Sequence, residues 1–185
     1  MGRPSNREAR RRELLGAFAR VLADHGYAGA TISAVANEAG VAPGLVHHHF
    51  ESKDDLLQSL LQMLTERFRG RIRRWESDSD PLLAYADAAL RLDARADHVA
   101  ARCWVGLFAE AVRNRRLFER VRRLIDREIV EIQRRSGNRF SPEEAGAVLA
   151  FVVGALVVGA FAPRRVAGFA APGLRRWIAA TRSAR

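Results

Sequence analysis

The side chains most able to do chemistry in this chain are three consecutive histidines, His47 to His49, and a single cysteine, Cys103. Consecutive residues of a helix point about 100° apart, so three histidines in a row cannot close on one metal ion. One cysteine excludes an intrachain disulfide and a four-cysteine zinc site, and we expect it to be an inert buried thiol. The sequence shows no Ser/His/Asp or Cys/His set, glycine-rich phosphate loop or paired carboxylates. We therefore expect no metal, no cofactor and no enzymatic activity.

The chain carries a large excess of positive charge. Its 31 Lys and Arg against 21 Asp and Glu give a formal net charge of +10, and Lys53 is the only lysine among them. A basic excess favours polyanionic partners, mainly nucleic acid, because binding releases condensed counterions. A compositional bias toward Ala and Arg also contributes to this excess. Charge alone therefore leaves nucleic-acid binding and simple bias both open.

The segment from Thr31 to Leu57 has the pattern of elements that could position such a contact. Thr31 is a candidate helix N-cap, and the apolar residues after it recur at the spacing of one helix face. Gly40 stands where that helix would stop, and Pro43 suits the start of a second helix because its φ is fixed and it lacks an N–H. The apolar positions are Ile32, Val35, Ala36 and Ala39, followed by Val41, Val46 and Phe50. This pattern predicts a helix-turn-helix, whose second helix can enter a DNA major groove.

The identities of these residues sharpen the prediction, because the segment resembles the DNA-binding domain of the TetR family of transcriptional regulators. The resemblance implies an all-α chain with a three-helix DNA-binding domain at residues 1–52. A helical effector-binding and dimerisation domain would follow at residues 53–185. The matching residues are the run from Thr31 to Ala39, then Ala39-Gly40-Val41, Pro43-Gly44, His49-Phe50, Ser52-Lys53 and Leu56-Leu57.

The resemblance also implies which residues contact a double-stranded DNA operator. In the family, a basic N-terminal arm can touch phosphate or the minor groove, and the exposed face of the second helix reaches base edges. Hydroxyl groups near the start of the preceding helix favour a phosphate, and the family's lysine after the second helix meets backbone phosphate. The expected contacts are therefore Arg3, Arg7, Thr31, Ser33, Ala42, Pro43, Gly44, Leu45, His47, His48 and Lys53.

Three of these residues depart from the family's usual pattern. Ala42 stands where Ser or Thr usually caps the second helix, a loss of about 1 kcal/mol that Pro43 partly offsets. Leu45 stands where Thr is frequent, and it offers only apolar contact, for instance to a thymine methyl. His47 stands where Tyr is frequent, and an imidazole donates to phosphate better when protonated. Operator contacts at these positions should therefore differ from the usual ones.

Apolar periodicity predicts further helices on both sides of the helix-turn-helix. The expected ranges are residues 6–25, 53–75, 81–95, 97–114, 117–136, 142–162 and 172–182. As in the family, a small-molecule effector would bind among the helices between residues 53 and 136. Candidate pocket walls are Phe68, Leu83, Leu90, Cys103, Leu107 and Phe108, and ordinary core packing is the alternative for each. The arginine-rich run 113–123 is most simply a solvated face.

Residues 145–162 form an uncharged stretch long enough to cross a membrane by length alone. The stretch is rich in Ala and Gly and follows an acidic helix start, Ser141-Pro142-Glu143-Glu144. A helix that is apolar all round can also be buried in protein, with one side on its own core and the other on a second subunit. We favour this homodimer over a membrane span, with Phe151, Gly154, Val158, Leu174, Trp177 and Ile178 at the interface.

Together these features predict a cytoplasmic, ligand-responsive and sequence-specific DNA-binding regulator. The charged N-terminus lacks the apolar segment of a signal peptide. As a homodimer, the regulator would bind a near-palindromic operator and act as a repressor. The alternative is a constitutive DNA-binding protein with a filled core and no small-molecule effector.

Overall fold

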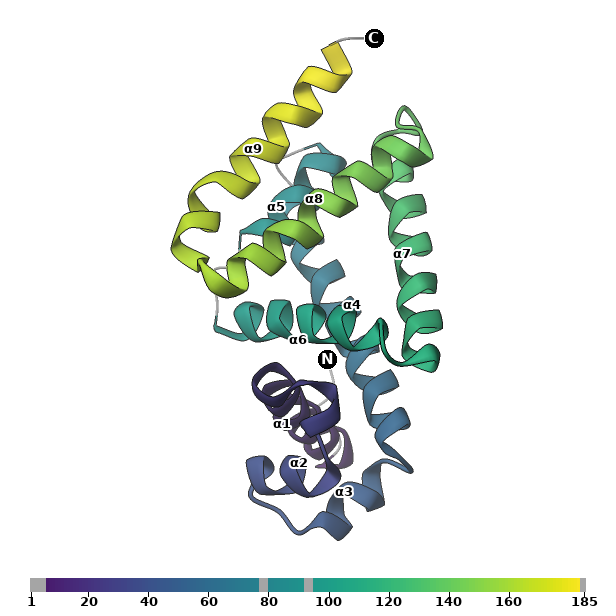
Figure 1. The fold of residues 1–185 in the computed structure, drawn as a ribbon, viewed down its shortest axis with the longest axis vertical. Coiled ribbons are helices and arrows are strands. Elements are labelled where there is room, and N and C mark those ends of the chain that lie inside the picture. Colours follow the sequence, from purple (N-terminus) through teal and green to yellow (C-terminus); the bar gives the residue numbers. More distant parts are fainter. Residues whose placement is uncertain (1–5, 77–79, 92–94, 184–185) are drawn as a thin grey trace. The chain divides into compact units, whose positions relative to one another are not determined.

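The computed structural model describes residues 6–76, 80–91 and 95–183, with side chains throughout except at residues 95–97, 163–165 and 167. Every regular element in these ranges is a helix, which confirms the all-α prediction (Figure 1). The helices are α1 (Asn6–Gly29), α2 (Ile32–Ala39), α3 (Pro43–His49), α4 (Lys53–Glu76), α5 (Pro81–Leu90), α6 (Arg95–Ala111), α7 (Arg115–Arg135), α8 (Pro142–Phe161) and α9 (Pro163–Ser183). The chain divides into two compact units, one up to Glu66 and one from Arg67.

The first unit contains the predicted helix-turn-helix, with its local signals as expected. The Thr31 hydroxyl accepts a hydrogen bond from the Ala34 N–H at 3.1 Å, so Thr31 is the N-cap of α2. Gly40 ends α2 at φ 66°, the left-handed conformation that glycine adopts without a Cβ penalty. Pro43 is the first residue of α3. The apolar faces meet in a core that includes Leu14, Phe18, Leu22, Val35, Ala36, Val46 and Phe50.

The expected boundary between the domains, after residue 52, falls where α4 begins. Contacts within the chain place the division further along α4, at Glu66. The early part of α4 belongs to the first unit because its apolar face is buried there: Leu56, Leu57, Leu60 and Leu64 are all covered. The helix therefore begins in one unit and ends in the other.

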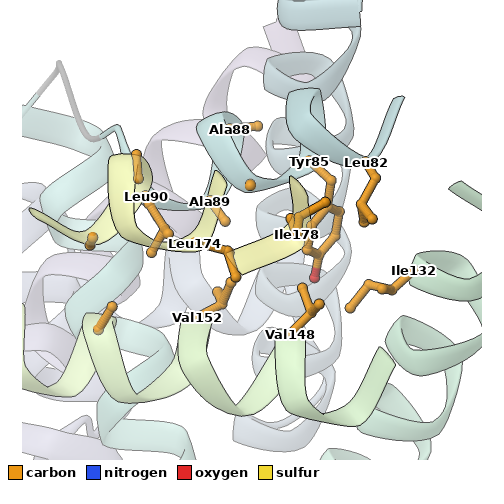
Figure 2. Close-up of a cluster of buried hydrophobic side chains, with 14 of the residues drawn as sticks. Leu82, Tyr85, Ala88, Ala89, Leu90, Ile132, Val148, Val152, Leu174 and Ile178 are labelled. Atoms are coloured by element: carbon orange, nitrogen blue, oxygen red, sulfur yellow. The ribbon is translucent and has the colours of Figure 1, made fainter. Parts of the chain in front are cut away.

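The core of the second unit forms around α5, which packs against α7, α8 and α9. Almost every residue of this short apolar helix is buried. Figure 2 shows Tyr85 and Leu82 of α5 beside Ile178 of α9, with Val148 and Val152 of α8 facing them. One side of α8 is thereby used for the chain's own core, through Ala145, Val148, Val152 and Ala155.

Two carboxylates of the α5 segment hold α9 through ion pairs. Two guanidinium nitrogens of Arg182 donate to the two carboxylate oxygens of Asp80, at 3.1 and 3.0 Å. Arg175 pairs with Asp87, whose other oxygen accepts from Arg91 at 2.8 Å. Burial alone would raise the pKa of Asp80, but hydrogen bonds from Arg182 and from the N–H groups of Leu83 and Leu82 lower it overall.

Two helix bounds differ clearly from the expectation. The helix expected over 81–95 ends at Leu90, after which Arg91 is extended at φ −91° and ψ 92°. The helix expected to begin near Pro172 begins at Pro163, and Pro172 lies inside it. Proline lacks the N–H that would bond to the carbonyl four residues earlier. That carbonyl belongs to Gly168, an exposed residue whose carbonyl water can satisfy, so the missing bond does not end α9.

Candidate nucleic-acid interface

Helix α3 has one covered side and one open side. Val46 is fully buried and anchors the helix, while Ala42, Pro43, Gly44, His47 and His48 are exposed and Leu45 is half-buried. The open side therefore holds the six residues of this segment that were predicted to reach base edges. It offers two imidazoles as hydrogen-bond donors, with small or apolar groups around them.

As predicted, α3 has no side-chain cap at its N-terminus. Ala42 has the extended conformation of an N-cap, φ −70° and ψ 144°, but makes no side-chain capping bond. Ala42→Ser should supply that bond and stabilise the protein by about 1 kcal/mol. We expect thermal unfolding to move up by about 2–4 °C per kcal/mol for a chain of this size. Ala109→Ser, at an exposed position within α6, is the control and should not raise it. An unchanged midpoint for Ala42→Ser would show that Pro43 already compensates.

The other predicted contacts in the first unit are accessible to different degrees. Arg7 on α1 and Ser33 near the start of α2 are exposed. Thr31 is exposed as well, but its hydroxyl already accepts from Ala34, so it can only donate to a phosphate. Arg3 lies outside the described residues.

Lys53 has a structural role that the sequence did not reveal. Its Nζ donates to the Tyr27 carbonyl oxygen at 2.5 Å, lies 3.4 Å from the Ala28 carbonyl oxygen, and sits 4.2 Å from the centroid of the Tyr27 ring. The cation thereby stabilises the C-terminal end of α1, where backbone carbonyls carry partial negative charge. An ammonium group has three donors, so the predicted phosphate contact at Lys53 stays a prediction.

Arg11 holds the C-terminal end of α3, and this role was also missed. Its guanidinium donates to the His49 carbonyl oxygen at 2.5 Å and to Ser59 Oγ at 2.7 Å, and lies 4.1 Å from the centroid of the Phe50 ring. Asp55 lies 3.7 Å away and balances the charge. One signal could have revealed this role: Arg11 shares the helix face of Leu14, Phe18 and Leu22.

His49 is half-buried at the end of α3 and belongs to the supporting structure. Burial lowers its pKa from 6.5, and the positive charges of His48, Arg7, Arg11 and Arg10 lower it further. Its Nδ1 is buried and has no hydrogen-bond partner among the described residues. No group of three His, Cys, Asp or Glu side chains that could hold a metal ion occurs in the part of the chain that the structure describes.

The lowered pKa of His49 predicts a loss of stability in mild acid. Between the folded-state pKa and 6.5, the unfolded chain binds more protons than the folded chain, so stability falls as the pH drops through this window. His49→Gln should remove that part of the pH dependence, measured by urea unfolding between pH 5 and 7.5. His47→Gln, at an exposed position on the same helix, is the matched control. Loss of the pH dependence in His49→Gln but not in His47→Gln would assign it to His49. A pH dependence that remains in both variants would contradict that assignment.

A second candidate surface lies on α8, on the side away from the core. We define the α8 outer face as Ala147, Ala150, Phe151, Gly154, Val157, Val158 and Phe161, all of which are exposed. The exposed fractions reach 48% at Val158 and 86% at Phe161. Trp177 and Phe169 of α9 are exposed apolar residues too. By length and composition, α8 is also the one described helix that could cross a membrane.

Two of the six residues expected at the dimer interface are buried within their own chain. Leu174 and Ile178 are fully buried in the core of their own unit, against α5 and α8, so they have no surface to offer a partner. Phe151, Gly154, Val158 and Trp177 are exposed, as a contact with another chain requires. The difference arises because α9 turns Leu174 and Ile178 toward α5, and Trp177 lies on another side of the helix.

The six expected pocket residues do not all join one cluster. Leu90 belongs to the core around α5, and Phe68 and Leu83 are partly buried against it. Cys103 and Leu107 of α6 are fully buried but are not members of that cluster, and Phe108 is half-buried. Their role as pocket walls stays a prediction.

A polar cluster that the sequence did not reveal lies beside Phe68. The Tyr85 hydroxyl donates to Glu128 Oε2 at 3.2 Å, and Arg69 Nη2 lies 2.6 Å from Glu128 Oε1. The Phe68 and Tyr85 rings meet edge to face, with centroids 5.4 Å apart. Burial raises the pKa of Glu128, although Arg69 opposes this change. Aromatic rings and a carboxylate from α4, α5 and α7 are thus brought together within the second unit.

Comparison with known proteins gives a consistent result. Residues 14–60 match the family described as bacterial regulatory proteins, tetR family. The chain is 34% identical over 120 residues to the HTH-type transcriptional regulator BetI of Rhizobium meliloti, covering 63% of this chain and 57% of that protein. It is 31% identical over 159 residues to BetI of Agrobacterium fabrum, covering 82% and 75%. These relatives are named as transcriptional regulators and not as enzymes.

Solved structures share the fold. A TetR-family transcriptional regulator from Rhodococcus sp. superimposes with a TM-score of 0.80 at 24% identity, over 94% of this chain and 98% of that one. A transcriptional regulator from Saccharomonospora viridis, solved in complex with choline, has a TM-score of 0.66 at 20% identity, over 92% and 96%. At these identities the likeness shows the fold alone.

Proposed function

Because the chain belongs to the TetR family, and is a DNA-binding transcriptional regulator, we propose that it is a ligand-responsive repressor acting as a homodimer on a near-palindromic operator. Residues 1–52 would bind the operator, and residues 53–185 would bind the effector and form the dimer. A repressor of this kind works at the chromosome, in the cytoplasm.

The observation that carries this proposal is the α8 outer face. Helix α8 is apolar on all sides, yet its own chain covers only one of them. Glu143 and Glu144 stand at its start, where Glu144 completes a capping box with Ser141. A second copy of the chain, related by a two-fold axis, would cover the outer face and make a four-helix bundle from two α8–α9 pairs. A membrane span would instead have to expose the buried side, which is built into the core around α5.

In the proposed complex, the open side of α3 enters the major groove. His47, His48 and Leu45 would face base edges, together with the backbone and small groups at Ala42, Pro43 and Gly44. Phosphate contacts would come from Arg3, Arg7, Thr31, Ser33 and Lys53. A dimer binds half-sites one helical turn apart, about 34–36 Å from centre to centre.

The effector is proposed to bind in the second unit, among α4 to α7. Phe68, Tyr85 and Glu128 lie together there, and aromatic rings with a carboxylate are groups that bind small organic cations. A structural neighbour was solved with choline, so choline and other small quaternary ammonium compounds are the first to test. An effector shifts the protein away from its DNA-binding form only by its differential affinity for the two forms.

Selection of bound duplexes from a random pool tests the proposal. Two related half-sites, with footprints in successive major grooves, are the expected result. Binding to the selected duplex is then measured with and without choline and a panel of quaternary ammonium compounds. Release of the operator by a compound that also raises the thermal midpoint supports the ligand-responsive repressor. A selected operator that no compound releases favours the constitutive DNA-binding protein.

A further inference from the structure

The outer side of α7 and the turn before it carry a dense set of arginines. Residues 113–127 contain seven arginines against two acids, Glu119 and Asp126. Four of the arginines are spaced i, i+4, i+7 and i+11, which places them in one stripe along the helix. At 1.5 Å per residue the stripe is about 16 Å long. We call it the α7 arginine stripe: Arg116, Arg120, Arg123 and Arg127.

Most members of the stripe lack the ion pairs that several other arginines of the second unit make. Arg69, Arg135, Arg175 and Arg182 each pair with a carboxylate on another helix or helix start, and Arg91 pairs with Asp87, four residues before it. Arg116, Arg123 and Arg127 are exposed and make no ion pair within the described part of the chain. The same holds for Arg113 and Arg115 at the N-terminal end of α7. The acid Glu119 pairs instead with Arg122, which lies to one side of the stripe.

This arrangement opposes the stability of the helix that carries it. Like charges at i, i+4, such as Arg123 and Arg127, repel each other, and cations near a helix N-terminus oppose the helix dipole. A bias toward arginine alone would not place so many arginines close together on one helix with only two acids among them. The pattern is that of a surface whose counter-charge comes from outside the chain.

We propose that the α7 arginine stripe binds the phosphate backbone of duplex DNA, outside the base pairs that α3 reads. Each strand of duplex DNA carries one phosphate per about 3.4 Å of axis, so the stripe is as long as about five phosphates of one strand. Guanidinium groups bind phosphate bidentately, and Arg116, Arg123 and Arg127 have no ion pair within the described residues that DNA would displace. Such contacts carry no base information, so they add affinity without adding specificity. The inference goes beyond the proposed repressor, because it concerns the second unit and DNA of any sequence.

The test compares two charge-matched variants of the full-length protein. Arg123→Gln/Arg127→Gln removes two charges from the stripe. Arg73→Gln/Arg176→Gln removes two charges from exposed positions on α4 and α9, neither of which makes an ion pair within the described residues. Affinity for a 30-bp duplex of random sequence is measured by fluorescence anisotropy between 50 and 200 mM NaCl.

Each lost phosphate contact should reduce the slope of log affinity against log salt by about 0.9, so the stripe variant should lose up to about 1.8 per protomer. The control variant should keep the slope of the natural protein. Thermal midpoints should be unchanged or higher in the stripe variant, because a like-charge pair is relieved. The preference for the selected operator over scrambled duplex should also be unchanged, which separates this inference from the proposed function.

Three outcomes would overturn the inference. An equal fall in slope for both variants would show an effect of net charge alone. No fall in either would show a solvated face. A stripe variant that binds DNA normally, but has lost binding to vesicles containing phosphatidylglycerol, would assign the stripe to a membrane surface.

Discussion

Val158→Glu should convert the protein from a dimer to a monomer and weaken operator binding by about 10²–10⁴-fold, the gain that joining two binding modules gives. Val158 lies in the C-terminal half of the α8 outer face and is 48% exposed in a single chain, so the substitution leaves the core intact. In the proposed dimer, the same carboxylate would be buried against the apolar face of the second copy without a partner, which is strongly unfavourable. Sedimentation at micromolar concentration and binding to the selected operator measure the two effects.

Val130→Glu is the matched control. Val130 is 63% exposed on α7 and lies outside the α8 outer face, so this variant should remain a dimer and bind the operator as before. Circular dichroism should show the helical content of the natural protein in both variants. A dimeric Val158→Glu with full operator affinity would remove α8 from the interface and, with it, the main support for the proposed assembly.

Replacing both arginines that neutralise Asp87 should destabilise the protein by about 3–5 kcal/mol, as expected when a buried charge loses its partners. The Asp87 side chain is only 2% exposed, whereas Arg91 and Arg175 are partly solvated. In Arg91→Ala/Arg175→Ala, the carboxylate therefore stays buried and uncompensated. Part of the loss will come from Arg91, whose guanidinium also lies over the Trp75 ring at 5.2 Å. Urea unfolding measures the change.

Two further variants isolate the buried charge. Adding Asp87→Asn to the double variant should restore part of the stability, because the amide is uncharged and similar in shape. Arg122→Ala/Arg134→Ala removes two exposed arginines from ion pairs within α7 and should have a much smaller effect on stability. If Asp87→Asn gave no recovery, lost packing of the arginine side chains would explain the effect instead.

The parts of the fold that the sequence predicted are those set by residues close in the chain. The N-cap at Thr31, the glycine at position 40 and the capping box at Ser141 each act within about four residues, and all three are as expected. The roles of Arg11 and Lys53 depend on partners more than twenty residues away. A periodic pattern does not identify such partners.

The same limit explains the errors at α9. Leu174, Trp177 and Ile178 all fit an apolar helix, and only the contact with α5 decides which of them is covered. Pro172 is a good start signal for a helix and yet lies within one, where the carbonyl it leaves unbonded belongs to an exposed residue, Gly168. For the candidate DNA interface, the sequence predicted which residues of α3 would be exposed, because one buried residue, Val46, fixes the orientation of so short a helix.

The two ion pairs between the α5 segment and α9 repeat at the same interval on both sides. Asp80 and Asp87 are seven residues apart, as are Arg175 and Arg182. Asp80 pairs with Arg182 and Asp87 with Arg175, so the two segments run in opposite directions. Sliding α9 by one turn would break both ion pairs together and leave Asp87 with Arg91 as its one remaining cation among the described residues. The two ion pairs therefore fix the position of α9 along α5. An effector that rearranges this unit would move α5 and α9 together as one rigid body.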